Sequence, residues 1–449
     1  MLFISPTIRA CKAAAHLWLL AIGFCVLAAL PGVVRAADAV PGEEYCDGSI
    51  DQITFTGNKK TRDIVLLEQL DFSAGDACSL DHVVDGIQSI MDLRLFRSVA
   101  ASFSHDSGVT TLDYQVVEKI YFLPIPRLSR TSDGELRYGA QLRWDNFRGR
   151  NHRLKLTAER REEDDGSGPG GDHYEIEYDI PRFFGSDVGV STELVYQRKL
   201  RQLEQDGIEF GTVDSNDSSV RLLLSRWVNQ GGVTQGLRYT LGFRIQQRDQ
   251  QLLSGVKGPF VEGTDVAIGI GFIKRDVRDE LFRLNGFEWG ARFELSSSAF
   301  GSSFDYNRTD IFYRRYRPLG GLSLRNLNYQ LRVGFSNDGP FGTRLYSLGG
   351  GESHRSREKR SKTGDVLVLA NIEYLVGWPG NQALRWVLFS DIGNVYRHND
   401  IDLLNQEFGF GAGIRWKVLK FSNTDLRLDA AWDQRERSLR YIFSTSLTF

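Results

Sequence analysis

Residues 136–144 read Leu-Arg-Tyr-Gly-Ala-Gln-Leu-Arg-Trp, with an apolar side chain at every second position and a polar residue or glycine at each position between them. Successive side chains of a β-strand point to opposite faces, so this alternation predicts a strand with one apolar and one polar face. The same period of two recurs along the rest of the chain, notably in residues 174–180, 237–245, 287–295 and 439–449. From about residue 119 onward the sequence therefore predicts an all-β domain.

Three features favour a transmembrane barrel over a soluble β-sandwich, whose strands would also alternate. The expected strands often span about 10–15 residues, longer than the usual 5–6 of soluble proteins. Their polar positions carry charges of both signs, as in a wet barrel lumen. The chain also ends in an aromatic residue, Phe449, on the apolar register. After residue 36 no run of about 18 apolar residues could form a spanning helix, so strands would have to cross the membrane.

Fifteen clear strands can be counted from Leu136 onward, and their connections alternate between short turns and longer loops. Short turns belong on the periplasmic side, so one more ascending strand must precede Leu136. The segment Lys119–Ser129 is the candidate and brings the number to sixteen. Its Pro124 and Pro126 lack the amide donors of a ladder, so we expect a weak seam between this strand and the last one, which ends at Phe449. The alternative is that the two prolines belong to a linker.

The charge balance excludes a nucleic-acid-binding protein. Lys and Arg number 55 against 57 Asp and Glu, a net charge of −2, whereas nucleic acid requires a clustered basic face. Residues 1–36 read as an export signal, because Arg9 and Lys12 precede an apolar run that ends in a small-residue cleavage site. A membrane anchor is the alternative for this segment. Cys46 and Cys78 remain after cleavage, and an even pair in an exported chain predicts a disulfide.

Residues 46–118 follow a different pattern. A short alternating strand around Ile53 precedes two amphipathic segments, which we expect to be helices capped by Thr61 and Ser79. Two more strands follow, around Val99–Ser104 and Val109–Val117. The order β-α-α-β-β predicts a small α+β domain.

This module resembles a POTRA domain, notably in Ile53-Thr54-Phe55-Thr56-Gly57-Asn58 and Leu95-Phe96-Arg97-Ser98-Val99. One such domain followed by a sixteen-stranded barrel resembles the Omp85 superfamily, in particular its BamA/TamA-like members with a surface-antigen D15-type barrel. We therefore expect a signal peptide (1–36), a POTRA-like periplasmic domain (46–118) and an outer-membrane β-barrel (119–449).

The resemblance is most specific in a glycine-rich loop and in a strand that follows it. Proteins of the superfamily fold a loop into the barrel, with an Arg-Gly-aromatic tip after a Gly-Gly pair. Here Gly349 and Gly350 precede Arg355, which falls on the motif arginine, while Ser356 and Arg357 replace the glycine and the aromatic residue. The superfamily's Phe-x-Asp-x-Gly motif is intact as Phe389-Ser390-Asp391-Ile392-Gly393.

Strand parity gives the motif arginine two candidate partners. The apolar positions of residues 366–376 and 384–388 would face lipid, which places Glu373 and Asp391 on the lumenal side. A guanidinium can bridge carboxylates through several hydrogen bonds at once. Our hypothesis is that Arg355 binds Asp391, with Glu373 nearby, and pins the loop inside the barrel. The alternative is a solvated basic hairpin.

The resemblance implies a factor for outer-membrane protein assembly or insertion, or for protein translocation. The alternatives are a dedicated exporter of one secreted partner and a passive outer-membrane pore, against which the N-terminal module argues. We expect no enzymatic activity, because no histidine lies near a nucleophile-elbow pattern, and no cofactor or metal.

The resemblance also implies a location and partners. We expect the barrel in the bacterial outer membrane and the POTRA-like domain in the periplasm. The expected partners are unfolded or nascent outer-membrane or secreted proteins, periplasmic chaperones or a periplasm-spanning protein, and outer-membrane lipid, but no nucleic acid.

Overall fold

The computed structural model describes residues 46, 48–130, 136–162, 171–205, 208–228, 235–255, 262–280, 282–320, 324–337, 346–358, 361–422 and 424–444. The predicted signal segment 1–36 and the terminal Phe449 lie outside these residues. No helix within the described residues has the length and apolarity needed to cross a membrane.

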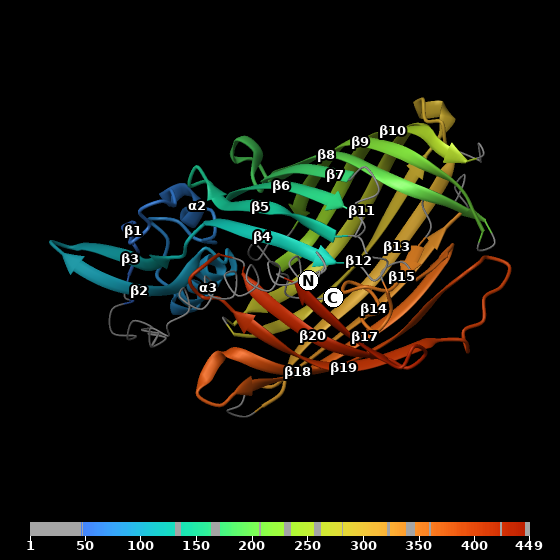
Figure 1. Ribbon diagram of the computed structural model, residues 1–449. Helices are drawn as coiled ribbons and strands as arrows, with labels where there is room; N and C mark the ends of the chain where they lie inside the picture. The colour runs from blue at the N-terminus through green and yellow to red at the C-terminus, as the bar shows by residue number, and fades with distance from the viewer. Residues whose placement is uncertain are drawn as a thin grey trace, which may run out of the picture. The chain divides into compact units, whose positions relative to one another are not determined.

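The N-terminal module is a three-stranded sheet with two helices (Figure 1). Its central strand β3 pairs in parallel with β1 and antiparallel with β2, which leaves β1 and β2 as the edge strands. Apolar side chains from the helices and the sheet, such as Leu66, Ile90 and Leu112, form one buried core. The elements are β1 (Gln52–Thr56), α2 (Asp63–Leu67), α3 (Leu80–Asp92), β2 (Phe96–Asp106) and β3 (Val109–Glu118).

The capping predictions for the two helices are only partly met. Helix α2 has Arg62 at its N-cap position in place of Thr61. The hydroxyl of Thr61 instead donates to Glu118 Oε1 at 2.7 Å and accepts from Asn146 Nδ2 at 2.8 Å. Ser79 does hold the N-cap position of α3, but its side chain makes no capping hydrogen bond.

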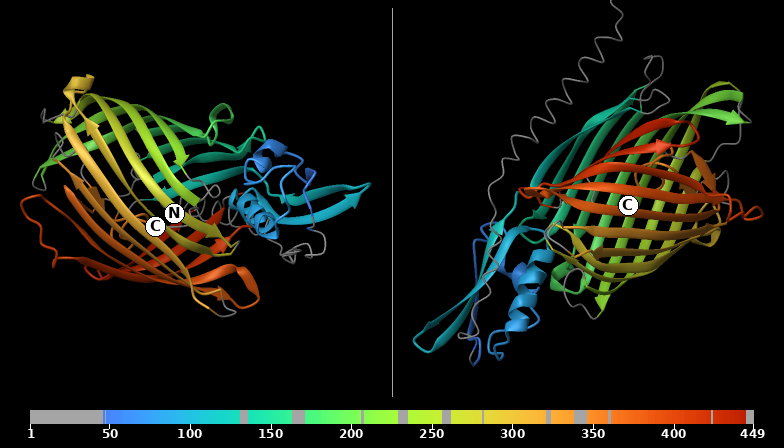
Figure 2. Two further views of the ribbon diagram at one scale, coloured as in Figure 1. Left: turned by 180° about the vertical axis from the view of Figure 1, so that it is seen from behind. Right: turned by 90° about the horizontal axis from the view of Figure 1, so that it is seen from below.

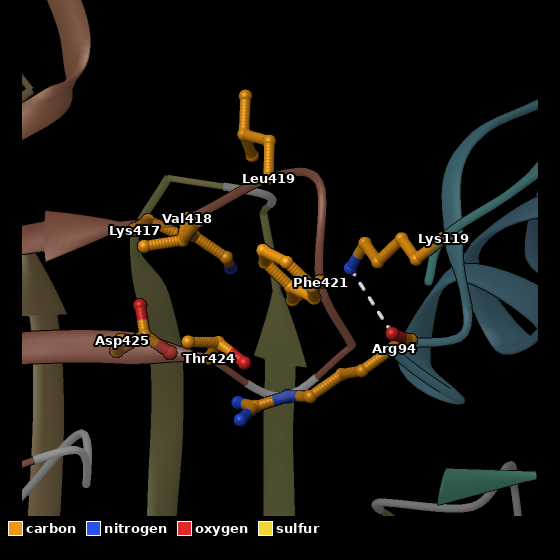
Figure 3. A pocket seen from close by; sticks show the side chains of 8 residues that line it. All are labelled: Arg94, Lys119, Lys417, Val418, Leu419, Phe421, Thr424 and Asp425. Carbon is orange, nitrogen blue, oxygen red and sulfur yellow. Dashed lines mark hydrogen bonds between the residues drawn. The ribbon is translucent and has the colours of Figure 1, made fainter. Parts of the chain in front are cut away.

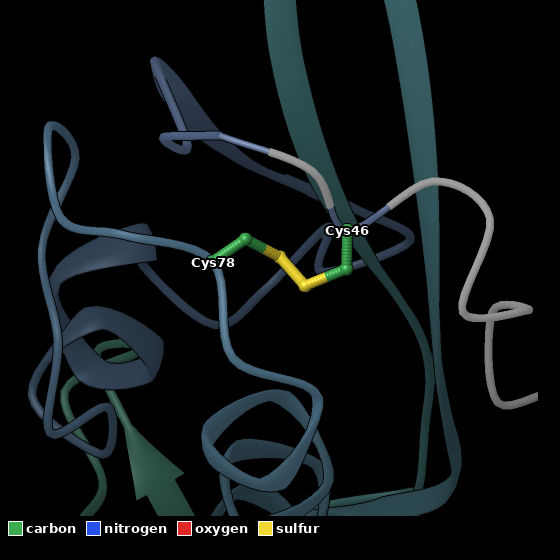
Figure 4. Close-up of a disulfide and its surroundings, with 2 residues drawn as sticks. All are labelled: Cys46 and Cys78. Atoms are coloured by element: carbon green, nitrogen blue, oxygen red, sulfur yellow. A yellow bond between two sulfur atoms is a disulfide. The ribbon is translucent and has the colours of Figure 1, made fainter.

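Cys46 and Cys78 form a disulfide in the structure (Figure 4). The bond links the segment before β1 to the residue that precedes Ser79 and α3, with 5.5 Å between the two Cα atoms. It closes a loop that contains β1 and α2, so it limits the conformations of the module when unfolded.

After the module, the described residues form one antiparallel sheet of sixteen strands, which confirms the predicted fold class, and a separate two-stranded hairpin between β14 and β17 (Figures 1 and 2). Spatial neighbours follow chain order throughout, from β4 at one end of the sheet to β21 at the other. The strands are β4 (Phe122–Arg130), β5 (Leu136–Phe147), β6 (His152–Glu162), β7 (Gly171–Ile180), β8 (Val188–Gln205), β9 (Ile208–Val228), β10 (Gln235–Gly255), β11 (Gly263–Asp279), β12 (Leu284–Ser296), β13 (Tyr306–Pro318), β14 (Asn326–Ser336), β17 (Val366–Trp378), β18 (Asn381–Tyr396), β19 (Glu407–Lys417), β20 (Asp425–Asp433) and β21 (Ser438–Ser444).

Burial follows the alternation read from the sequence. On β17 and β18 the apolar Ile372, Trp386 and Leu388 are exposed on the outer face, while Glu373 and Asp391 are buried on the inner face. This is the reverse of a soluble protein and is the pattern of a barrel with a lipid-facing outside and a polar inside. Sixteen strands leave an interior wide enough to hold further chain.

The first strand, β4, carries its two prolines on the edge that faces away from β5. Asp145 N donates to Tyr121 O at 2.8 Å, so the odd-numbered residues direct their backbone groups toward β5. The even-numbered Pro124 and Pro126 therefore turn their nitrogens to the opposite edge. Among the described residues no ladder joins that edge to β21, the last strand in the sheet order.

The segment before β4 is nevertheless bound at its base. Ile120 N donates to Lys420 O at 2.9 Å, and Ser422 N donates to Ile120 O at 3.0 Å. These bonds attach the end of the N-terminal module to the β19–β20 turn. Ile120 is also even-numbered, and its backbone N and O face away from β5 toward the β19–β20 turn. The backbone groups of Pro124 and Pro126 face the same way.

A cluster of charged side chains lies where the module meets this turn and the end of β11 (Figure 3). Asp279 accepts ion pairs from Arg94 at 2.9 Å and from Lys417 at 3.1 Å. Lys119 donates to the carbonyl oxygen of Arg94 at 3.0 Å. Burial, and next the charge of Lys417, lowers the pKa of Lys119 to about 8.

Candidate functional site

The glycine-rich loop between β14 and β17 includes its own short hairpin, β15 (Tyr346–Leu348) and β16 (Lys362–Gly364). Gly349 and Gly350 follow β15 with φ of +108° and +89°, a region that only glycine occupies without strain. A Cβ on Gly349 would also overlap the carbonyl oxygen of Glu358. The two glycines thus let the loop turn sharply, ahead of the segment that carries Arg355.

Arg355 lies in the barrel interior with 1% of its side chain exposed. Its backbone N and its Nε donate to Asp391 Oδ2 at 2.9 and 2.8 Å, and its Nη2 donates to Asp391 Oδ1 at 2.5 Å. Its Nη1 donates to Glu373 Oε1 at 2.6 Å. The guanidinium carbon lies 3.7 Å from the centre of the Phe389 ring, in cation–π geometry. The structure therefore brings Arg355 together with Asp391 and Glu373, the partners expected from strand parity, and with Phe389 of the motif.

Two further arginines and one aspartate contact these residues and form with them a network of six buried charges. Arg415 Nη2 donates to Glu373 Oε1 at 2.7 Å, and its Nη1 binds Asp429. Arg427 Nε donates to the other oxygen of Asp429 at 2.6 Å. Three guanidiniums thus face three carboxylates, and each of the six side chains is at most 3% exposed. The formal charges cancel, as burial requires.

Asn371 connects the loop backbone to this charge network. Its side-chain amide donates to Asp391 Oδ1 at 2.7 Å and to the carbonyl oxygen of Ser353 at 2.9 Å. Its own oxygen accepts from Gln330 on β14 at 3.1 Å. The loop is therefore held by a neutral amide as well as by ion pairs.

Serine at the motif glycine position is accommodated by a glycine on a neighbouring strand. Ser356 is buried, and a Cβ placed on Gly409 of β19 would overlap its hydroxyl oxygen. The Ser356 hydroxyl also lies 3.1 Å from His354 Nδ1, and His354 Nε2 lies 3.1 Å from the carbonyl oxygen of Glu407. The added hydroxyl thus fills the space that Gly409 leaves.

Arginine at the motif's aromatic position makes ion pairs in place of ring packing. Arg357 binds Glu407 on β19 and lies 3.2 Å from Asp433 at the end of β20. Lys362 binds the other oxygen of Glu407. Arg357 and Lys362, which the alternative hypothesis would leave solvated, therefore contact lumenal carboxylates.

Of the other predicted residues, Gly393 lies on β18 with Asp391, and the two prolines lie elsewhere in the sheet. A Cβ on Gly393 would press against the carbonyl oxygen of Val368, so this glycine allows close approach of β17 and β18. Pro124 and Pro126 lie at the free edge of β4, far along the sheet order from β17 and β18. Phe449 lies outside the described residues.

Sequence reasoning missed Asp429, Arg415 and Arg427. All three occupy lumenal positions of β19 and β20, and the alternation of those strands was available as a signal. The alternation gives the face of a residue but not its height in the barrel, which depends on the register between strands. The role of Gly409 was missed for the same reason, because it depends on the loop atom that packs against this glycine, the Ser356 hydroxyl oxygen.

These features define a class of protein: a barrel of sixteen strands that follows a small POTRA-like module and holds a loop in its lumen. The sequence matches the Omp85 superfamily domain over residues 146–449 and the POTRA family, described as a surface antigen variable number repeat, over residues 49–119. The chain belongs to the Omp85 superfamily, and the resemblance found in the sequence is confirmed. A search of curated proteins finds no match.

Solved structures with the same fold include BamA from Haemophilus ducreyi lacking POTRA domains 1–3, with 16% identity, a TM-score of 0.51, and coverage of 88% of this chain and 84% of that one. CdiB from Escherichia coli shares 15% identity with a TM-score of 0.61, and the match covers 89% and 75% of the two chains. CdiB from Acinetobacter baumannii also shares 15% identity, with a TM-score of 0.58 and coverage of 88% and 73%. At this identity the likeness shows the fold alone.

Proposed function

We propose that this chain is an outer-membrane factor that assembles or inserts other outer-membrane proteins, or translocates proteins, in the manner of the Omp85 superfamily. The observation that carries the proposal is the Omp85 domain match over the barrel, together with the POTRA match before it. The Arg355 network supports it, because a loop fixed by six buried charges forms a permanent part of the lumen.

The proposal assigns one role to each part of the chain. Residues 1–36 are the export signal, residues 46–118 the periplasmic POTRA-like domain, and residues 119–449 the barrel in the bacterial outer membrane. Strands β1 and β2 are the edges of the POTRA-like sheet, and an extended client chain can add to such an edge through backbone hydrogen bonds. The clients are unfolded outer-membrane or secreted proteins, delivered by periplasmic chaperones or a periplasm-spanning partner, and the chain catalyses no reaction.

A dedicated exporter of one secreted protein is the second candidate. The likeness to the two CdiB structures, both with higher TM-scores than BamA, makes this candidate worth testing. A passive pore is the third, and the loop held across the lumenal face of β17, β18 and β20 argues against it.

Depletion of the protein, followed by quantitative profiling of the outer membrane and the culture medium, tests the proposal. Broad loss of barrel proteins from the outer membrane is the result expected for an assembly factor. Loss of one secreted protein with an unchanged outer membrane would favour the exporter. Unchanged protein profiles combined with reduced uptake of small solutes would overturn the proposal in favour of the pore.

A further inference from the structure

One side of the barrel lumen carries an excess of arginine. The inner face of β10–β14 lies opposite the exposed apolar side chains of the same strands, such as Tyr239, Ile270 and Leu331. Six arginines lie at inner positions of these strands and are here called the arginine wall: Arg238, Arg275, Arg292, Arg308, Arg314 and Arg332.

Only two carboxylates pair with this wall among the described residues. Glu288 lies 3.5 Å from Arg275 and 2.9 Å from Arg314. Asp310 lies 3.2 Å from Arg308 and 2.8 Å from Arg332. Each carboxylate is therefore shared by two guanidiniums, which leaves one positive charge in excess at each pair.

Among the described residues no ion pair joins Arg238 or Arg292 to a carboxylate, and Glu288 acts on the charge of Arg238 only at longer range. The Arg238 guanidinium instead lies 5.2 Å from the centre of the Trp227 ring on β9, in cation–π geometry. The Arg292 side chain is exposed to the lumen. The side chains of Arg275, Arg314 and Arg332 also remain about a third exposed, so their charges can still reach a ligand.

The lumenal positions of β6 and β7, which β8 and β9 separate from β10, do not share this excess. On β7 and β6, Glu175 and Glu177 share the single Lys155, while Asp179 pairs with Arg153 at 2.6 Å. Further along β10 than Arg238, the inward-facing Arg244 pairs with Asp265 at 3.2 Å and with Glu294 at 3.0 Å. These three residues contribute one arginine and two carboxylates, so arginines still outnumber carboxylates on the inner face of β10–β14 when they are included.

We infer that the arginine wall binds an acidic stretch of a polypeptide client while it occupies the lumen. Guanidiniums in a fixed row attract carboxylates at long range and bind them through paired hydrogen bonds. The rings of Trp227 and Phe312, each next to a wall arginine, offer apolar contact between the charges. The inference rests on the proposed function, since it names the chemistry of the client that the barrel handles.

Peptide binding to the full-length protein in detergent tests the inference. Two labelled peptides of equal length are compared by fluorescence anisotropy, one of alternating Glu and Ser and one of alternating Lys and Ser. The Glu peptide should bind more tightly, and its affinity should fall as salt rises, because the wall is in contact with water. In the double variant Arg238→Gln/Arg292→Gln the affinity should fall about tenfold, as expected for two partly solvated ion pairs.

Two matched variants separate charge from structure. Arg238→Lys/Arg292→Lys keeps the charges and should retain most of the affinity. Arg221→Gln removes a lumenal arginine outside the wall, one that pairs with Glu193 at 2.7 Å, and should leave Glu-peptide binding unchanged. The heat-dependent shift of the folded band on a gel shows for each variant that the barrel is formed.

Three results would overturn the inference: equal binding of the two peptides, equal affinity in the wall variant and in Arg221→Gln, or full displacement of the Glu peptide by inorganic phosphate. The last would mean a site for small anions. Because this experiment uses no cells, its failure is distinct from that of the proposed function, which the depletion experiment decides. Loss of outer-membrane proteins on depletion without Glu-peptide binding would retain the function and reject the acidic client.

Discussion

The charged side chain of Arg355 is almost completely buried, so its stability there depends on every carboxylate that pairs with it. Removing an arginine from water costs several kcal/mol, which only close carboxylates and well-formed hydrogen bonds offset. Asp391 accepts three hydrogen bonds from Arg355 alone, one of them from the backbone. Loss of this carboxylate would therefore leave a buried guanidinium with Glu373 as its near partner, and Glu373 is shared with Arg415.

The first prediction is that Asp391→Asn destabilises the barrel by about 3–5 kcal/mol, the usual cost of breaking a buried ion pair. The temperature at which the folded band converts to the unfolded band on a gel should fall. Asp179→Asn is the matched control, since Asp179 also faces the lumen and pairs with Arg153, but its side chain is 25% exposed. That control should cost about 1 kcal/mol or less, and equal effects of the two changes would refute the pin.

A second prediction concerns the serine at the loop tip. Gly409→Ala should destabilise the barrel by about 1–3 kcal/mol, because the new Cβ would overlap the Ser356 hydroxyl. Adding Ser356→Gly should recover part of this loss, since it removes the overlapping atom while His354 still lies close to the site. The same gel assay on both single variants and the double variant gives the coupling between the two positions. Additive losses would show that Ser356 and Gly409 do not pack against each other.

At the residue scale the sequence predicted the face of Glu373 and Asp391, but not their full set of partners. A period of two fixes only whether a side chain points in or out. Asp429 reaches Arg355 at 3.7 Å through a register spanning β18, β19 and β20, and no local pattern encodes that register. The replacement of the motif's aromatic residue by Arg357 is likewise explained by Glu407 and Asp433, which pair with this arginine from β19 and β20. The sequence gives no sign that these two carboxylates lie beside the loop.

At the scale of single elements, β4 shows how proline chemistry and register act together. The sequence predicted a weak strand from Pro124 and Pro126, and the alternation of backbone groups adds a direction. Both missing donors lie on the edge away from β5, so pairing with β5 is preserved while the other edge loses two hydrogen bonds. In the proposed function this edge is one side of the seam between the first and last strands.

The third prediction is that Pro124→Val/Pro126→Val stabilises the folded barrel. The change supplies two amide donors at the seam edge, each worth about 0.5–1.5 kcal/mol if paired. The midpoint of heat-induced unfolding on a gel should rise. Pro181→Val, in the turn after β7, adds a donor elsewhere and should give no rise. A double variant with an unchanged or lower midpoint would show that the prolines do not limit pairing at the seam.

At the scale of the whole molecule, the sequence predicted a small α+β module and a sixteen-stranded barrel but not the contacts between them. Asp279 ends β11 and receives Arg94 and Lys417, which lie far away in sequence. Its backbone N also donates to Asp92 at 3.1 Å, at the end of α3. Such contacts depend on where the barrel turns lie in space, and neither composition nor periodicity predicts them.

Asp279→Asn should loosen the module from the barrel without unfolding either part. The change removes the carboxylate shared by Arg94 and Lys417, while the buried core around Leu66, Ile90 and Leu112 keeps its contacts. Hydrogen exchange at Ile120 and Ser422 should accelerate, because their amides bond across the junction, while exchange within β3 should not change. Asp81→Asn removes an equal charge from the exposed side of α3 and is the control. Equal exchange in the two variants would mean that the ion pairs at Asp279 do not hold the junction.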